Sequence, residues 1–406
     1  MAARFQKIDL ASQAFARDPF PTYARLREAG PVFQARLPLL GKTWLATTYQ
    51  AASEILKDEE NFVMEAKKVG KTFFIGILRL LPRILRVFTD NMLYHDDPDH
   101  RRLRRLVEQA FSRHSVENMR DRIGVLCDGL LAGLAGRETV DLLQEWARPL
   151  PVAVICELLG LPDEDRPKFT RWVKALFRSV SLFGMLLTLP SLFRLLKYFR
   201  RHFEQCRRQP RPGLMTALVQ AEQDGDKLSE DELLAMAFLL LFAGFETTVH
   251  LLGGGTLALL KAPGQKERLL NDWSLLPRAV EELLRFVSPV QMSEARYVTR
   301  DLELHGQSLR RGDSIVALLG AANADPARFP DPQKLDLSRS PNPHLSFGSG
   351  MHFCLGAQLA RVEAQVGFER LFSRYPRLAL VMADSELKYS GNMLLRALVA
   401  LPVRLR

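Results

Sequence analysis

Cysteine is scarce in this sequence, and the few cysteines that it has lie far apart. There are four among the 406 residues, Cys127, Cys156, Cys206 and Cys354. The chain has no C-x-x-C pair, so the spacing argues against a disulfide framework and against a structural zinc site. We expect three of the four to be packing residues, as Cys156 is in the apolar stretch VAVICELLG.

Signals for membrane targeting are also missing. The first twenty residues, MAARFQKIDLASQAFARDPF, contain no apolar core of the kind that a signal peptide has. The longest uncharged apolar stretch, residues 181–193, is interrupted by Pro190. It is also shorter than the roughly 18 residues that suggest a membrane span. We therefore expect a cytoplasmic protein.

Neither repeats nor a Gly/Ser-rich linker divides the chain, and no nucleic-acid-binding module is visible. The net charge is +10, but the basic residues are spread along the sequence, with the densest runs at 100–105 and 200–211. Each run is as consistent with a solvated helix face as with a binding surface. We expect no nucleic-acid partner, whereas an acidic protein or an acidic lipid surface would fit the charge.

Helical periodicity dominates the rest of the sequence. Apolar residues recur at three-to-four spacing in 99–112, 115–135, 164–178, 191–207 and 355–374. A further helix is predicted to begin near Pro277 and to end before Pro289, since proline favours a first turn and cannot continue a helix.

Signals for β-strands are few. DLELHGQSL predicts a hairpin that turns at Gly306, and DSIVALLG predicts a buried strand. Residues 323–343 are rich in proline and aspartate and predict an ordered loop. The sequence therefore predicts a mainly α fold with a small β region.

The longest predicted helix is apolar almost throughout, but it contains one weak point. SEDE predicts a capping box, with Ser229 as the N-cap and Glu232 three residues later, and the helix can run to Lys261. Inside it, AGFETT spans residues 243–248, where a glycine and two threonines favour a bend. A carboxylate beside a hydroxyl, Glu246 beside Thr247, can relay protons to a bound species. A surface-facing turn of a kinked helix is the alternative.

Cys354 lies in FGSGMHFCLGA, between a glycine-rich loop and the start of the helix predicted at 355–374. A thiolate at a helix N-terminus is stabilised by unsatisfied amides and by the helix dipole. As a haem ligand it would favour O–O cleavage. The alternatives are a packing residue and a nucleophile with His352 as its base. The nucleophile lacks an apparent third orienting group.

This loop resembles the haem-binding loop of the cytochrome P450 superfamily, whose pattern is Phe-Gly-x-Gly-x-His/Arg-x-Cys-x-Gly. The constrained positions are all met, by Phe347, Gly348, Gly350, His352, Cys354 and Gly356. Three further motifs follow the order of the family. AGFETT resembles the oxygen-activating stretch, Glu282 and Arg285 in EELLR resemble the Glu-x-x-Arg pair, and HDDPDHRRLR resembles the early-helix segment of bacterial members.

The resemblance implies a single triangular cytochrome P450 domain over residues 1–406, of the soluble bacterial type. Haem b would lie between the long helix and the cysteine loop. Cys354 would be the axial ligand, shielded by Phe347, and the glycines Gly348 and Gly356 would belong to the cofactor-binding loop.

The remaining roles that the resemblance implies fall on polar and small residues. Glu246 and Thr247 would be catalytic and would supply protons during oxygen activation. Ala243 and Gly244 would leave the groove in which O₂ binds. The expected partners of the haem propionates are His100, Arg104, Arg296 and His352.

Two positions depart from the family pattern. Ala324 stands in AANADP where the family often has arginine, which weakens one expected salt bridge in the loop before the cysteine motif. Phe245 is bulkier than the residue often found between the small pair and the acid, and we expect it to narrow the pocket.

The resemblance implies a monooxygenase that hydroxylates or epoxidises a hydrophobic small molecule such as a fatty acid, terpenoid, steroid or polyketide. The apolar segments 73–88 and 181–199 would line the substrate entrance, or be ordinary core helices, and weak contact with a membrane surface is compatible with their basic residues. Electrons would come from a ferredoxin-type donor with its reductase, steered by Arg101, Arg102 and Arg105. The alternatives are a peroxide-driven peroxygenase and a non-catalytic haem protein that binds ligands.

Overall fold

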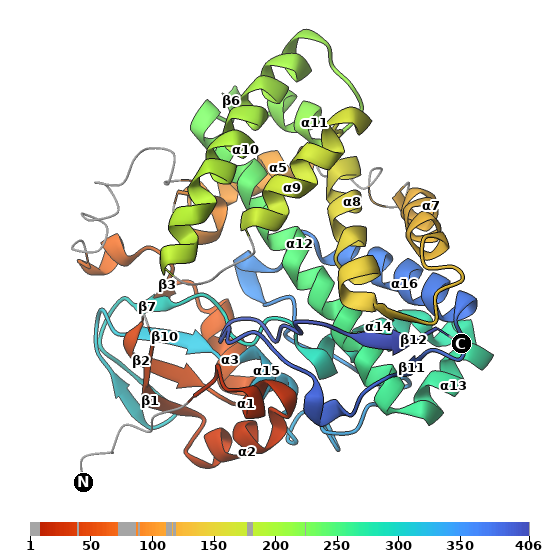
Figure 1. Cartoon of the computed structure of the whole chain (residues 1–406). Helices are drawn as coiled ribbons and strands as arrows, with labels where there is room; N and C mark the ends of the chain where they lie inside the picture. Colours follow the sequence, from red (N-terminus) through yellow and green to blue (C-terminus); the bar gives the residue numbers. More distant parts are fainter. Residues whose placement is uncertain are drawn as a thin grey trace. The chain divides into compact units, whose positions relative to one another are not determined.

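The computed structural model describes residues 9–38, 40–71, 87, 90–110, 116, 119–176, 182–223 and 225–405. These residues are mostly helical and form one five-stranded sheet and three smaller ones (Figure 1). The predicted mainly α fold with a small β region is therefore confirmed. The chain divides into two compact units. Unit 1 comprises Met1–Thr72, Cys127–Arg148 and Thr247–Arg406, and unit 2 comprises Phe73–Leu126 and Pro149–Glu246.

Unit 1 contains all the strands of the described residues except one hairpin. Its five-stranded sheet has the order β1-β2-β10-β7-β3. Only β10 and β2 pair in parallel; the other neighbours are antiparallel. The strands are β1 (Val32–Leu37), β2 (Gly41–Ala46), β3 (Phe62–Val63), β7 (Arg296–Val298) and β10 (Ser314–Ala317). A second sheet has the order β11-β12-β4, with β4 (Thr139–Asp141), β11 (Ala379–Leu380) and β12 (Pro402–Arg404).

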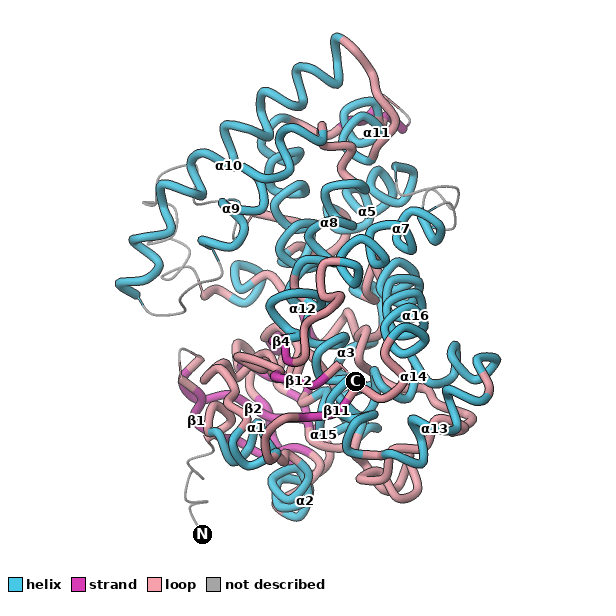
Figure 2. The backbone as a smooth tube through the Cα atoms, turned by 45° about the vertical axis from the view of Figure 1, so that its right-hand side comes forward, coloured by secondary structure: helices cyan, strands magenta, loops and turns pink. Residues whose placement is uncertain are grey.

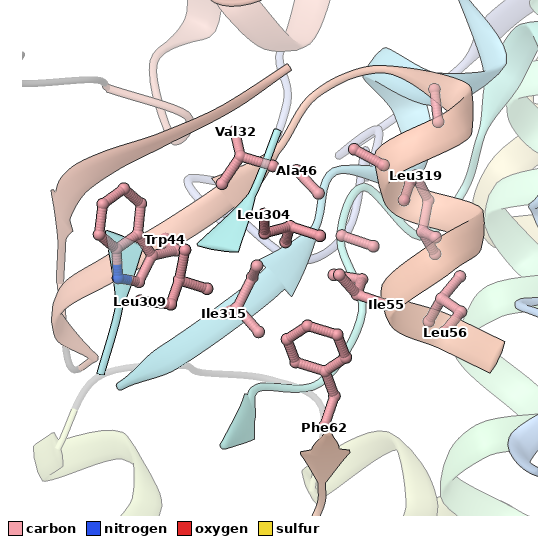
Figure 3. Close-up of a cluster of buried hydrophobic side chains, with 14 of the residues drawn as sticks. Val32, Trp44, Ala46, Ile55, Leu56, Phe62, Leu304, Leu309, Ile315 and Leu319 are labelled. Atoms are coloured by element: carbon pink, nitrogen blue, oxygen red, sulfur yellow. The ribbon is translucent and has the colours of Figure 1, made fainter. Parts of the chain in front are cut away.

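The helices of unit 1 are α1 (Gln13–Arg17), α2 (Phe20–Glu28), α3 (Tyr49–Lys57), α13 (Pro263–Asn271), α14 (Leu276–Val287), α15 (Leu319–Asn323) and α16 (Ala357–Arg374). One face of the five-stranded sheet packs against α3, and Figure 3 shows Ile55 of that helix pointing toward Ile315 of β10. Ile315 and Ile55 are completely buried. Apolar side chains thus fix the sheet against α3, whose far end approaches the cysteine loop.

Unit 2 is almost entirely helical, as Figure 2 shows. It contains α5 (Asp99–Ala110), α8 (Pro149–Leu158), α9 (Arg166–Leu176), α10 (Leu182–Arg208) and α11 (Leu214–Gln220), with the hairpin of β5 (Glu222–Gln223) and β6 (Asp226–Lys227). Two helices have residues in both units, α7 (Met119–Ala132) and α12 (Glu230–Lys261). The helix predicted at 191–207 begins earlier than expected, because α10 continues upstream through Pro190.

The local predictions for the turns and strands are confirmed. The DLELHGQSL segment forms the antiparallel hairpin of β8 (Leu302–Leu304) and β9 (Gln307–Leu309). His305 and Gly306 both have positive φ angles, of 48° and 76°, as a tight two-residue turn requires. The strand predicted in DSIVALLG is the fully buried β10. No helix or strand is assigned at 324–343, where an ordered loop was predicted.

The long central helix is the predicted one. The Ser229 hydroxyl accepts from the Glu232 amide at 3.3 Å, and the Glu232 carboxylate accepts from the Ser229 amide at 2.8 Å, which confirms the capping box. Among the described residues one helix, α12, is long and apolar enough to cross a membrane, although no stretch of the sequence was expected to be long enough. However, 67% of the most apolar window of α12 is buried inside the protein, as is typical of a core helix.

The glycine triplet in α12 allows its second half to pack closely on neighbouring helices. A Cβ atom on Gly254 would lie 2.7 Å from Val287 of α14, and one on Gly255 would lie 2.6 Å from Phe368 of α16. Both distances are shorter than any ordinary carbon contact. These glycines therefore bring α12 against α14 and α16.

The Glu282–Arg285 pair of α14 is completely buried, unlike most ion pairs at this helical spacing, which lie on the surface. Arg285 donates from Nε and Nη2 to the two carboxylate oxygens of Glu282, both at 2.8 Å. Its Nη1 donates to the backbone carbonyls of Asn323 and Pro332 at 2.9 and 3.0 Å. Arg285 thus connects α14 to Asn323, directly before the loop at 324–343, and to Pro332, near the middle of that loop.

Glu282 holds the second half of the same loop. Its carboxylate accepts from Arg339 Nε at 3.1 and 3.2 Å, from Asn342 Nδ2 at 3.1 Å and from the Asp336 amide at 3.1 Å. A buried ion pair is stable only when further hydrogen bonds satisfy its remaining polar atoms. Here the loop at 324–343 supplies them, so loop and pair stabilise each other.

Replacing Glu282 by glutamine leaves Arg285 buried without its counter-charge, and we expect the free energy of unfolding to fall by about 3–5 kcal/mol. Urea unfolding followed by circular dichroism measures this change. Glu267→Gln on the exposed surface of α13 is the matched control, for which we expect a change below about 0.5 kcal/mol. If the two variants were equally stable, the ion pair of Glu282 and Arg285 would not stabilise the fold through the loop at 324–343.

Candidate functional site

Cys354 closes a tight loop directly before α16. Its amide donates to the Phe347 carbonyl at 2.9 Å, and its carbonyl accepts from the amide of Ala357, the first residue of the helix, at 3.3 Å. Between Phe347 and Cys354 lies the short 3₁₀ helix η7 (Gly350–His352). The cysteine is thus held by main-chain hydrogen bonds at the N-terminal end of an 18-residue helix.

Two glycines are required by the shape of this loop, and a third leaves space beside it. Gly348 and Gly350 have φ angles of +69° and +73°, which L side chains rarely adopt. A Cβ atom on Gly350 would also lie 2.3 Å from the Leu56 carbonyl oxygen at the end of α3. A Cβ atom on Gly356, in contrast, would meet nothing within 4 Å. The surface beside Gly356 is open enough for a flat group to approach the backbone.

Cys354 differs from the other cysteines in exposure. Cys127, Cys156 and Cys206 are buried, whereas Cys354 is exposed. Burial raises the pKa of Cys127 to about 11 and that of Cys156 to about 12, so both stay protonated at neutral pH. This supports the prediction that those cysteines are packing residues, and it leaves Cys354 as the accessible thiol.

A conventional metal centre does not account for this thiol. Within the part of the chain that the structure describes, there is no group of three or more His, Cys, Asp and Glu side chains that could hold a metal ion. His352, the base in the nucleophile hypothesis, lies half-buried in η7. An exposed thiol beside an open backbone surface would suit a flat cofactor whose metal ion is already held by ligands of its own, as in haem.

A cluster of charged and aromatic side chains supports Phe347. The Arg361 guanidinium of α16 lies over the Phe347 ring, 4.6 Å from its centroid. Glu281 of α14 accepts from Arg361 Nε at 2.7 Å and from Nη2 at 3.0 Å. Its carboxylate also lies 3.1 Å from His344 Nε2, and the His344 ring packs against Phe347 with 5.8 Å between ring centroids. We call Glu281, His344 and Arg361 the Phe347 clamp.

The clamp was not predicted from the sequence. Glu281 precedes Glu282 in EELLR, but Arg361 lies 80 residues and His344 lies 63 residues away along the chain. Burial alone would raise the pKa of Glu281, but hydrogen bonds from His344 and Arg361 lower it to about 2. The Glu281 carboxylate is therefore ionised at every physiological pH.

Arg296, a predicted partner of the haem propionates, lies in unit 1 in a buried position. It begins β7, is 2% exposed, and donates from Nη1 to the Phe62 carbonyl at 3.3 Å. A guanidinium in such a buried position can bind a carboxylate strongly, because the local dielectric constant is low.

His100 and Arg104 lie one turn apart on α5 of unit 2. His100 is 2% exposed, and burial together with the Arg104 guanidinium lowers its pKa below the ordinary value. Arg104 donates from Nε to Glu108 at 2.7 Å. Propionate binding by Arg104 would therefore compete with a surface ion pair.

The AGFETT segment lies within a continuous helix. Residues 243–248 are all helical, so the weak point predicted from the glycine and threonines does not break α12. The buried side chains on either side, such as Phe238 and Val249, outweigh these small local penalties. Ala243 and Gly244 are exposed, and Glu246 and Thr247 are half-buried.

Phe245, one of the two departures from the family pattern, is completely buried. The other, Ala324, is 2% exposed. The neighbouring Asp325 carboxylate accepts from the backbone amides of Tyr49 at 2.8 Å and Ala327 at 3.0 Å.

The two apolar segments expected to line the substrate entrance are only partly described. Of residues 73–88, all but Val87 lie outside the described residues, as do the side chains of 181–187. From Leu192 onward, most apolar side chains of α10, such as Leu195 and Phe199, are buried, whereas Phe193 is exposed. The segment 192–199 therefore supplies core residues of unit 2.

Comparison with known proteins identifies the family. A family model for cytochrome P450 matches residues 27–397. The polyketide biosynthesis cytochrome P450 PksS of Bacillus subtilis is 41% identical over 394 residues, which cover 96% of either chain. Its solved structure superposes with a TM-score of 0.90 and covers 98% of this chain and 99% of its own.

Two further relatives show the range of molecules that such proteins handle. The 6-deoxyerythronolide B hydroxylase of Saccharopolyspora erythraea is 36% identical and covers 98% of both chains. A structure of P450BioI in complex with a hexadec-9Z-enoic acid ligated acyl carrier protein is 33% identical. It has a TM-score of 0.87 and covers 98% of this chain and 100% of that one. The predicted resemblance is confirmed along almost the whole sequence, and the chain belongs to the cytochrome P450 family of haem-thiolate monooxygenases, with bacterial relatives.

Proposed function

We propose that this protein holds haem b through the Cys354 thiolate and inserts one oxygen atom from O₂ into a hydrophobic polyketide or long acyl chain. The observation that carries the proposal is the exposed Cys354 thiol, fixed by main-chain hydrogen bonds directly before α16 and beside the open surface of Gly356. When bound, the haem supplies reductive activation of O₂, and thiolate ligation favours O–O cleavage.

The chain's own residues prepare the thiolate. α16 begins three residues after Cys354, and its first amides favour a negative charge on the sulfur atom. Phe347 covers the loop from one side and is fixed by the Phe347 clamp. Arg296 and His352 of unit 1, with His100 and Arg104 of unit 2, are the proposed donors to the haem propionates.

Proton delivery is assigned to Glu246 and Thr247. The half-buried Glu246 carboxylate can take up a proton from solvent and pass it to the Thr247 hydroxyl oxygen, which lies next along the helix. Ala243 and Gly244, the exposed small residues one turn earlier, leave room beside α12 for O₂. This set of residues favours donor-driven turnover, because hydrogen peroxide brings both of its protons with it, whereas O₂ needs protons from solvent.

The relatives narrow the substrate class. Two of them are named for polyketide biosynthesis and for hydroxylation of 6-deoxyerythronolide B, and a third binds an acyl chain attached to a carrier protein. We infer a polyketide or fatty acyl substrate, delivered on an acyl carrier protein. We also infer a cytoplasmic location, one domain over residues 1–406, and a separate ferredoxin-type electron donor with its reductase.

Of the three arginines expected to steer the electron donor, two are paired with carboxylates of the protein itself. Arg101 pairs with Asp97, and Arg102 pairs with Glu232 and, at 3.4 Å, with Asp226. Arg105 is exposed on the same helix and keeps its charge for steering a donor.

The spectrum of the dithionite-reduced protein with carbon monoxide tests the haem assignment. We expect a far red-shifted Soret band for the wild type and for Cys206→Ala, and a band typical of histidine-ligated haem for Cys354→His. The reason is that only thiolate ligation shifts this band so far. A wild-type band at the histidine position would overturn the assignment of Cys354, and a thiolate band without donor-driven turnover of any acyl substrate would favour the non-catalytic alternative.

Thr247→Ala and Glu246→Gln should uncouple electron use from product formation. We expect the product formed per electron to fall about 10²-fold, since a positioned proton donor contributes at least that much. The measurement compares NADPH or NADH oxidation, hydrogen peroxide release and product.

Thr256→Val is the matched control on the same helix. The Thr256 side chain is completely buried, and its hydroxyl has no hydrogen-bond partner among the described residues. Its replacement should leave the coupling unchanged. Wild-type coupling in Thr247→Ala, with faster turnover by peroxide than by the donor, would indicate the peroxygenase alternative.

Glu281→Gln should weaken the Phe347 clamp in a pH-dependent way. The pKa of Glu281 in the folded protein is about 2, below its ordinary 4.5. Its ionised form therefore stabilises the fold above the unfolded pKa, and the contribution is lost as the pH falls through this interval. We expect Glu281→Gln to be less stable than the wild type at pH 7 and the difference to shrink as the pH approaches 2. Thermal unfolding at several pH values measures it, and a difference that is constant with pH would refute the role of the charge.

A further inference from the structure

The solvent-facing side of α10 carries a large share of the protein's positive charge. Between Phe193 and Arg211 the sequence has seven cations and a single acid, Glu204, while the whole chain has a net charge of +10. All seven are exposed, namely Arg194, Lys197, Arg200, Arg201, Arg207, Arg208 and Arg211. We call these residues the α10 basic face; six of them lie on α10, and Arg211 lies three residues beyond its last residue, Arg208.

The charge of this face is compensated very little within the protein. Arg207 pairs with Glu230 at 3.0 Å. None of the other six side chains forms an ion pair with another residue that the structure describes. On α5, in contrast, Arg101, Arg102 and Arg104 all have carboxylate partners. The α10 basic face therefore keeps its field for an external partner.

The orientation of the face is fixed by the other side of the helix. Leu195, Phe199 and Phe203 are completely buried, and the helix packs against α9 and α11 of the same unit (Figure 2). Only one large apolar side chain of this stretch, Phe193, is substantially exposed, at 45%. A helix that docks on a membrane needs an exposed apolar face beside its cations. The α10 basic face lacks one, so its chemistry favours an acidic protein over a lipid surface.

The dimensions of the face suit a small partner. Arg194 and Arg208 are fourteen residues apart on one helix, which corresponds to about 21 Å at the helical rise per residue. A charged strip of this length matches one helix of a small acidic protein, and such complementarity sets register and association rate. Acyl carrier proteins are small, acidic and helical, and they present their substrate on a flexible arm.

We propose that the α10 basic face is the docking surface for the acyl carrier protein that delivers the substrate. This inference rests on the proposed function in one respect only, that the substrate is an acyl chain presented on a carrier. The electron donor, which is also acidic, is assigned to a different surface, and the polar character of the described part of the face favours a protein over a membrane.

The test uses the full-length haem-loaded protein with Arg194→Glu, Lys197→Glu and Arg201→Glu combined, which leaves the Arg207–Glu230 pair intact. The probe is an acyl carrier protein carrying hexadec-9Z-enoic acid, with free hexadec-9Z-enoic acid in a parallel titration. Association with the immobilised carrier is measured directly at low and at moderate salt. The matched control combines Arg36→Glu, Arg310→Glu and Arg377→Glu, three exposed cations of unit 1 with the same total change in charge.

We expect the α10 variant to bind the loaded carrier at least about tenfold more weakly and with less salt dependence, since the charges that steer and orient the carrier are reversed. Binding and donor-driven oxidation of the free acid should be unchanged in it. The control variant should resemble the wild type in every assay.

Three results would overturn the proposal. The first is that both variants bind the loaded carrier equally well. The second is that the wild type binds the free acid but not the carrier. The third is that the α10 variant loses binding only to the ferredoxin donor or to anionic vesicles. Failure of the proposed function is distinguishable, because it would abolish oxidation of the free acid in all three proteins while leaving the direct carrier measurement interpretable.

Discussion

The buried Glu282–Arg285 pair is the interaction on which the order of the cysteine loop depends. Arg285 reaches the Asn323 carbonyl, and the Asn323 side chain continues the network. Its Oδ1 accepts from the Leu345 amide at 2.7 Å, and its Nδ2 donates to the Ser346 hydroxyl at 2.9 Å. The next residue is Phe347, whose carbonyl holds the Cys354 amide. A chain of satisfied polar groups thus runs from the ion pair to the thiol, and in a low-dielectric interior each bond strengthens its neighbours.

The charged residues of this protein have two different uses. In the buried Glu282–Arg285 pair and the half-buried Phe347 clamp of unit 1 they are paired, and there they fix geometry. On the outer side of α10 they are exposed and almost unpaired, where they act at a distance through their field. The net charge alone does not separate these uses, because it counts an arginine inside an ion pair and a solvated arginine alike.

Much of the architecture could be predicted from local patterns. The capping box of α12, the turn at Gly306, the strand at Ser314–Ala317 and the loop after Asn323 depend on residues close together in sequence, and all were found. The complete cysteine motif also identified the family. The contacts that join distant segments could not be predicted, since no local pattern links Arg361 to Glu281 or Arg102 to Glu232, which are 80 and 130 residues apart. The burial of the Glu282–Arg285 pair was likewise invisible, because the same spacing occurs on solvated helices.

The close approach of Gly350 to the Leu56 carbonyl has a consequence for how this protein can diverge. The thiol is positioned by main-chain contacts between a loop and the end of α3, and only a residue without a Cβ atom fits there. Substitutions of side chains elsewhere can therefore adapt the protein to new substrates without displacing the sulfur atom. The backbone conformation of the loop preserves the position of the reactive sulfur atom, while the substrate selectivity can change through other residues.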